Sequence, residues 1–178
     1  MPYLPPPEMG WIVPFSFQVP QQDKDLVEAE LQRLLNELGP QCEIPEISVN
    51  TVIRGEWQVA GNSKNIPGFE SNTPFANIPS ELKNGPVILC LHGGGYISGS
   101  PAMERSATLK LAELSGARMF AVDYRLAPQH PFPAALIDAI LAYKYLINPP
   151  SDAIHEAIDP RKLIIAGDSA GVFLPSFH

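Results

Sequence analysis

The sequence contains little cysteine, little positive charge and no long hydrophobic run. Two cysteines, Cys42 and Cys90, are too few for a disulfide framework, and Cys90 lies in an apolar run where a free thiol packs as a small hydrophobic group. Lysine and arginine number 12 against 19 acidic residues, and the net charge of −7 argues against binding to a nucleic-acid backbone. We therefore expect a protein of a reducing compartment that does not bind nucleic acid.

Targeting and membrane signals are also missing. The first 20 residues lack the basic start and the continuous apolar stretch of a signal peptide. No apolar run approaches the roughly 18 residues that a membrane span needs. These features predict a soluble, cytoplasmic protein with no transmembrane segment, and they give no indication of its oligomeric state.

The length of 178 residues fits one domain, which can bury close to 70% of the surface that its unfolded chain exposes. Charged residues make up 17% of the chain, below the roughly 25% of average globular domains, and its 20 prolines are about twice the usual share. The composition predicts a globular, loop-rich protein.

The N-terminal third is expected to differ from the rest. Residues 1–20, rich in proline and aromatic side chains, are predicted to be irregular, whereas residues 23–38 have the periodicity of a helix that Gly39 and Pro40 end. The apolar face of this helix is predicted to comprise Val27, Leu31, Leu34, Leu35 and Leu38. An ordinary docking helix and a membrane or lid surface both fit this face. One or two strands are expected within residues 46–85, in the stretch 47–60.

From Pro86 onward, buried strands alternate with helices. Strands are predicted at 87–91, 119–122 and 163–166, with helices at 101–115 and 134–146 between them. Ser100 and Gly116 are the expected caps of the first helix. Inward faces are expected at Met103, Ala107, Leu111 and Leu114 in the first helix, and at Leu136, Ile140, Tyr143 and Ile147 in the second. The alternation predicts an α/β fold with a mostly parallel open sheet.

Two motifs follow two of these strands. Gly167-Asp168-Ser169-Ala170-Gly171 comes directly after the strand at 163–166, the context of a nucleophile elbow, in which flanking glycines allow a tight turn and the serine hydroxyl is exposed. His92-Gly93-Gly94-Gly95 comes after the strand at 87–91, and its glycines can aim backbone N–H groups at a developing oxyanion. Taken singly, the GDSAG motif could be a plain βα turn, and the HGGG motif could be a flexible turn.

Together the motifs resemble the hormone-sensitive-lipase-like family of α/β-hydrolases, and the resemblance is dense over residues 85–171. The segment at 122–136 looks like the family's Tyr-Arg-Leu-Ala-Pro stretch. The family implies an α/β-hydrolase fold, with residues 1–45 as a cap-like segment and residues 46–178 as an incomplete hydrolase domain. It implies a serine carboxylesterase or lipase-type hydrolase that acts on a small-molecule acyl ester, with no cofactor and no metal.

The resemblance also implies roles for single residues. Ser169 is the expected nucleophile, and the amides of Gly94, Gly95 and Ala170 are the expected oxyanion hole. The remaining motif residues are expected to support the motif without acting in catalysis: His92, Gly93, Gly167, Asp168 and Gly171. In this fold the acid and the histidine of the triad follow the serine along the chain.

Those partners are not found after Ser169. The following residues contain no Asp or Glu, and their single histidine is His178. A continued helix would place His178 on the order of 13 Å along the axis from Ser169, and Pro175 disfavours that helix. A rearranged triad would have to draw on earlier residues, for which the candidates are Asp123, Asp138, Asp152 and Asp159 with His130 and His155.

We therefore expect that the family pattern is interrupted after Gly171, through an early stop, a retained intron or a truncated gene model. The chain is then the N-terminal half of an ester hydrolase and is inactive by itself. The alternatives are a non-catalytic small-molecule-binding relative of the same fold and a fragment without function. The acyl and alcohol groups of the substrate and the pathway are not encoded in these motifs.

Overall fold

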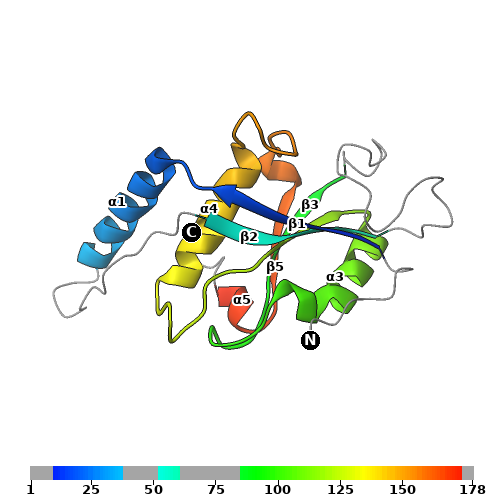
Figure 1. Ribbon diagram of the computed structural model, residues 1–178, viewed down its shortest axis with the longest axis horizontal. Helices are drawn as coiled ribbons and strands as arrows, with labels where there is room; N and C mark the ends of the chain where they lie inside the picture. Colours follow the sequence, from blue (N-terminus) through cyan, green and yellow to red (C-terminus); the bar gives the residue numbers. More distant parts are fainter. Residues whose placement is uncertain (1–9, 38–51, 61–84, 174–178) are drawn as a thin grey trace.

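A computed structural model describes residues 10–37, 52–60 and 85–173. They form a five-stranded sheet in the order β1-β2-β4-β3-β5, flanked by helices (Figure 1). The strands are β1 (Trp11–Gln18), β2 (Val52–Val59), β3 (Val87–Leu91), β4 (Arg118–Val122) and β5 (Leu163–Gly167). The helices are α1 (Gln21–Glu37), α3 (Pro101–Ser115), α4 (Ala134–Ile147), the 3-10 helix η2 (Pro160–Lys162) and α5 (Ala170–Phe173).

The sheet combines a parallel part with an antiparallel part. Strands β4, β3 and β5 run parallel, whereas β2 is antiparallel to both β1 and β4. Each parallel strand is linked to the next by a helix, as predicted from the alternating pattern. The α/β class and the strands and helices expected from residue 86 onward are confirmed to within one residue at most boundaries.

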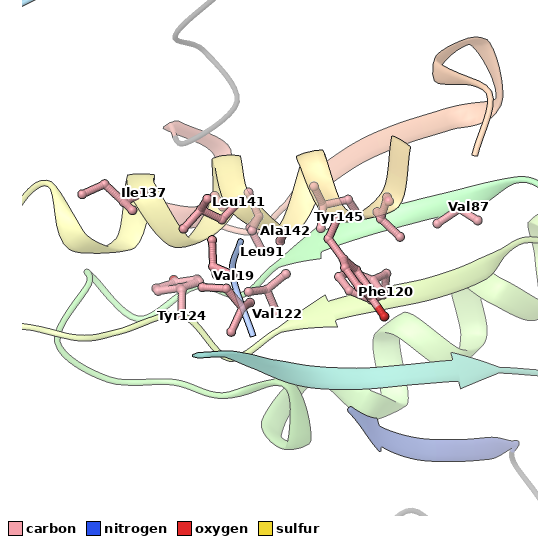
Figure 2. Packing of buried hydrophobic residues seen from close by; sticks show 14 of the residues in the cluster. Val19, Val87, Leu91, Phe120, Val122, Tyr124, Ile137, Leu141, Ala142 and Tyr145 are labelled. Carbon is pink, nitrogen blue, oxygen red and sulfur yellow. The ribbon is translucent and has the colours of Figure 1, made fainter. Parts of the chain in front are cut away.

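The two faces of the sheet are covered by different helices, because successive strand residues point to opposite faces. On one face, Val87, Leu89 and Leu91 of β3 join the main core beneath α4. Figure 2 shows this layer, in which Ile137, Leu141, Ala142 and Tyr145 of α4 lie over residues of the sheet. On the other face, Ile88 and Cys90 pack with Ala112 of α3.

Helix α1 lies beside α4, which it contacts (Figure 1). Val27, Leu31 and Leu35 are buried, so most of the predicted apolar face is confirmed. Leu34 is exposed, and Leu38 lies outside the described residues, as does the helix stop at Gly39 and Pro40. An ion pair joins Asp23 Oδ1 to Lys144 Nζ of α4 over 2.8 Å.

The N-terminal segment differs from the prediction of irregular structure. Trp11–Gln18 forms β1, which pairs along its length with β2. Its proline, Pro14, is tolerated because β1 is an edge strand in the described sheet. Alternating aromatic side chains pack inward from it, and the Phe15 ring stacks on that of Phe120 at 4.1 Å between centroids. The expected cap-like segment of residues 1–45 therefore contributes a strand to the sheet, and its boundary lies outside the described residues.

The predicted inward face of α3 is wrong. Met103, Ala107, Leu111 and Leu114 are exposed, whereas the buried positions are Pro101, Arg105, Leu109 and Ala112. The two sets differ by two residues, which is about 200° around a helix. The face that carries Arg105 packs on the sheet, and β2 supplies a partner for this charge. Arg105 Nε donates to Glu56 Oε1 over 2.7 Å in a buried ion pair.

The caps of α3 follow the prediction. Ser100 is extended at the N-cap, Pro101 is the first helical residue, and Gly116 adopts the left-handed conformation with φ 66° and donates its N–H to Ala112. The inward face of α4 is broader than expected. Leu136 is buried, as predicted, but Ile140 and Tyr143 are only partly buried, and the deepest positions include Ile137, Leu141, Ala142 and Leu146.

Candidate active site

The two sequence motifs meet at one edge of the sheet. Strands β3 and β5 are parallel neighbours, and the last residue of one, Leu91, is paired with the last residue of the other, Gly167. The HGGG loop and the GDSAG turn therefore leave the sheet side by side. The Asp168 amide donates to the Leu91 carbonyl over 3.3 Å, which extends the contact by one residue beyond the strands.

Ser169 occupies the tip of a strained turn between β5 and α5. Its φ of 47° lies in the left-handed region, which residues other than glycine rarely adopt. Ser169 is exposed. The turn is closed by hydrogen bonds from Gly171 N to Asp168 O, at 2.7 Å, and from Val172 N to Ser169 O, at 3.1 Å. This is the strand-turn-helix arrangement that presents a serine hydroxyl at the end of the sheet.

The flanking glycines are required by space. A Cβ on Gly167 would lie 2.4 Å from the backbone of Gly171, and a Cβ on Gly171 would lie 2.0 Å from the Leu91 carbonyl oxygen. Both distances are impossible for real side chains. Gly93 is similarly close to the turn, because its Cβ would lie 2.6 Å from Asp168 Oδ2. Asp168 thus packs against the glycine loop, which agrees with a supporting position in the motif.

The glycine loop has a backbone shape that glycine makes possible. Gly94 and Gly95 have φ values of 115° and 63°, and a Cβ on Gly94 would lie 2.1 Å from the Ser98 carbonyl oxygen. The Gly94 carbonyl accepts from the amides of Ile97 and Ser98. Within the part of the chain that the structure describes, the amides of Gly94, Gly95 and Ala170 donate no hydrogen bond, so they remain open to an acceptor.

His92 is buried beneath this loop. Its Nδ1 lies 2.7 Å from the Gly93 carbonyl oxygen, so the tautomer that carries a proton on Nδ1 donates to that oxygen. Its ring stacks on Tyr124 with 4.0 Å between centroids and 8° between planes. The Tyr124 hydroxyl in turn donates to the His92 carbonyl. His92 is thus held by contacts with Gly93 and Tyr124, and among the described residues no hydrogen bond joins its ring to Ser169.

Two supporting side chains were not identified from the sequence. Tyr96 donates its hydroxyl to the Ala170 carbonyl over 2.6 Å and so joins the glycine loop to the helix after the elbow. Glu104 Oε1 accepts from the Gly93 amide over 2.8 Å. Tyr96 could have been found, since a tyrosine directly after the glycines needs a hydroxyl partner. No local sequence pattern identifies Glu104 as a supporting residue, because its partner Gly93 lies 11 residues earlier.

Ionisable groups near the motifs are tuned mainly by burial. Burial raises the pKa of the Tyr96 hydroxyl above its ordinary value, so it stays a donor at neutral pH. Burial, with a smaller effect of Glu104, raises the pKa of the Cys90 thiol to about 12. Cys90 is therefore an unreactive thiol within β3, and Cys42 lies outside the described residues.

Two of the candidates for a rearranged triad, Asp138 and His155, make contacts elsewhere. Both oxygens of Asp138 accept from Arg125, with Nε and Nη2 at 2.9 to 3.1 Å. His155 is buried between the rings of Trp57 and Tyr145. Among the described residues, no hydrogen bond joins the Ser169 hydroxyl to a histidine, and no cluster of three or more His, Cys, Asp or Glu side chains suits a metal ion. His178 and Pro175 lie outside the described residues.

The fold and the elbow define an α/β hydrolase. A family model described as alpha/beta hydrolase fold matches residues 88–174. Residues 88–174 thus match this family, which confirms the family resemblance and the fold class expected from the sequence. No helix of the described residues is long and apolar enough to cross a membrane.

Three similar proteins, two named as hydrolases and one as an esterase/lipase, are longer than this chain. The acetyl-hydrolase of Streptomyces hygroscopicus is 39% identical over 152 residues, which cover 83% of this chain and 48% of that protein. The ethyl acetate hydrolase of Pseudomonas putida is 41% identical over 87 residues, covering 49% and 26% of the two proteins. The crystal structure of an esterase/lipase from an uncultured bacterium matches with a TM-score of 0.51 and 32% identity, over 82% of this chain and 49% of that one. The chain thus spans about half or less of each.

Proposed function

We propose that these residues supply the nucleophile and the oxyanion hole of a carboxylic-ester hydrolase. One observation carries the proposal. Ser169 lies in a strained turn after β5, and the neighbouring strand β3 is followed by Gly94 and Gly95, whose backbone N–H groups donate no hydrogen bond among the described residues. The names of the two relatives, acetyl-hydrolase and ethyl acetate hydrolase, support a short acyl ester as the substrate. We also propose that α1 is the part of the N-terminal segment that acts as the expected cap.

The proposed chemistry is acyl transfer in two halves. The Ser169 oxygen attacks the ester carbonyl while a histidine takes its proton, and the amides of Gly94, Gly95 and Ala170 bind the oxyanion. The intermediate collapses to an acyl-enzyme, and the leaving alcohol takes the proton from the histidine. Water then attacks the acyl-enzyme by the same route and releases the acid. No cofactor or metal enters these steps.

Among the described residues, no hydrogen bond joins the Ser169 hydroxyl to a histidine. We therefore propose that the polypeptide of residues 1–178 lacks turnover by itself, because an oxyanion hole without a base retains only a small part of the catalysis of a complete triad. This polypeptide should hydrolyse p-nitrophenyl acetate no faster than its Ser169→Ala variant. A serine-dependent burst of p-nitrophenol would contradict this statement.

A chimera tests the hydrolase function directly. Residues 1–171 would be joined to the part of the Streptomyces hygroscopicus acetyl-hydrolase that follows its matching glycine. We expect the folded chimera to hydrolyse p-nitrophenyl acetate, and its Ser169→Ala variant to lose this activity by a factor of about 10³ or more. Circular dichroism of both chimeras controls for folding. Activity that is unaffected by Ser169→Ala would contradict the role of Ser169 as nucleophile, whereas a folded chimera without any activity would favour the non-catalytic ligand-binding alternative.

A further inference from the structure

A cavity of about 1020 Å³ lies at the end of the sheet opposite to the elbow. It is lined by Gly85, which lies two residues before β3, by Arg118 at the start of β4, by Lys162 at the end of η2 and by most of the segment 148–159. Figure 1 shows this segment in orange at the upper end of β5, whereas α5 follows the lower end. Because β3, β4 and β5 are parallel and begin at the cavity, it is separate from the candidate active site at their carboxyl ends.

Arg118 is a buried cation in the wall of this cavity. The residue is 5% exposed, and among the described residues its Nε has no hydrogen-bond partner and no carboxylate lies within ion-pair distance. Its Nη2 makes a single long contact of 3.5 Å with the Gly85 carbonyl, and its guanidinium lies 5.4 Å from the centre of the Trp57 ring. A buried charge without a counter-ion is costly, so an anion in the cavity would be stabilised strongly.

His155 lies beside Arg118 in the same wall. It is buried, and neither ring nitrogen has a hydrogen-bond partner among the described residues. Its imidazole packs on the ring of Tyr145 at 4.8 Å and on that of Trp57 at 5.4 Å between centroids. Burial lowers its pKa to about 4, so it is neutral at pH 7 and offers one N–H donor. Backbone groups of Tyr145 and Leu146 act on the imidazole and partly oppose this lowering of its pKa. Among the described residues, the guanidinium of Arg118 is thus the donor without a carboxylate partner, and the neutral imidazole lies beside it as a second polar group of the wall.

The other groups of the cavity limit the charge of a ligand. Arg118 and Lys162 contribute two positive charges, which Glu156 and Asp159 balance. A singly charged anion therefore fits better than a phosphate ester with two negative charges. The rest of the wall is largely apolar and comprises Pro149, Pro150, Ala153, Ile154, Ala157 and Ile158. Sites for small organic ligands combine such a wall with a few directed polar groups, at volumes of about 300 to 1,000 Å³.

We propose that this cavity binds a small organic monocarboxylate, with its carboxylate on Arg118 and His155 and its apolar body against Ile154 and Ile158. Arginine suits this role because two parallel N–H groups match the two oxygens of a carboxylate. The proposal requires no function of Ser169. It stands or falls independently of the ester hydrolase activity.

Isothermal titration of residues 1–178 with sodium benzoate at pH 7 tests the proposal, with benzamide as the neutral ligand of matched shape. We expect saturable binding of one benzoate with a Kd on the order of 1 mM, and benzamide binding at least about tenfold weaker. Equal affinity for the two compounds, or no saturable binding of benzoate, would overturn the proposal.

Variants assign the binding to this cavity. Arg118→Met removes the cation and should weaken benzoate binding about tenfold or more. Arg118 is buried, so its variant can misfold, and Ile154→Asp provides a second test. Ile154 is partly exposed at the rim of the cavity. A carboxylate at this position should repel the ligand without altering the core. Lys110→Met removes a cation from the exposed side of α3 and should leave the Kd unchanged. Benzoate binding that survives Ile154→Asp in a folded protein, or that is lost in Lys110→Met, would refute the site.

Discussion

At the scale of single residues, Asp138 fixes the chain segment that follows β4. It is 1% exposed and accepts from the backbone amide of Arg125 over 2.9 Å as well as from its guanidinium. Burial raises the pKa of the Asp138 carboxyl, and the Arg125 guanidinium opposes this shift. The pair is positioned directly after Tyr124, whose hydroxyl supports the His92 carbonyl. Asp138 is thereby a structural link between α4 and the glycine loop.

Removing this carboxylate should destabilise the protein. Asp138→Ala removes the carboxylate that faces the largely buried Arg125 guanidinium, and we expect the free energy of unfolding to fall by about 3–5 kcal/mol. Urea denaturation followed by circular dichroism measures the change. Glu113→Gln is the control, because it breaks an exposed ion pair with Lys110 and should cost less than about 0.5 kcal/mol. Equal losses in the two variants would contradict the structural role of Asp138.

His155 should make stability depend on pH. Its pKa is about 4 in the folded protein, mainly through burial and with a smaller effect of Arg118, against 6.5 in the unfolded chain. Between these values the unfolded state binds more protons, so the free energy of unfolding falls as the pH is lowered from 6.5 to 4. We expect His155→Gln to reduce this fall by about 2–3 kcal/mol, as measured by urea denaturation at pH 7 and pH 4. An unchanged pH dependence would show that His155 titrates normally.

At the scale of elements, the elbow depends on close contact between α5 and β3. Gly171 has an ordinary φ, so only space excludes a side chain there, whereas Gly116 after α3 has a φ of 66° and nothing within 4 Å of a Cβ. Gly171→Ala should therefore cost more than about 2 kcal/mol through overlap with the Leu91 carbonyl. Gly116→Ala should cost about 1 kcal/mol through backbone strain alone. Thermal and urea denaturation of both variants compare the two costs, and a larger loss in Gly116→Ala would contradict this account of the elbow.

The elements also show which features a sequence can reveal. The strands at 87–91 and 163–167 were predictable because continuous apolar runs lead directly into glycine motifs, and pairing of the two strands brings the motifs together. Local patterns could not reveal β1, whose proline and aromatic residues are stabilised by pairing with β2 across the sequence. The face of α3 was mistaken for the same reason. Arg105 is buried only because Glu56 of β2 lies opposite, a partner 49 residues away.

At the scale of the whole molecule, β5 is an edge strand of the described sheet. It pairs with β3 on one side and with no other strand among the described residues, and Ile164 on it is 54% exposed. An uncharged edge strand with an exposed apolar side chain can pair with a second copy.

We expect residues 1–178 to associate with increasing concentration, as measured by light scattering after size exclusion. Ile164→Lys should suppress this association. Leu114→Lys, which replaces a 76% exposed apolar residue on α3, should not. Equal suppression by both variants would show that general surface hydrophobicity, rather than the edge of β5, drives association.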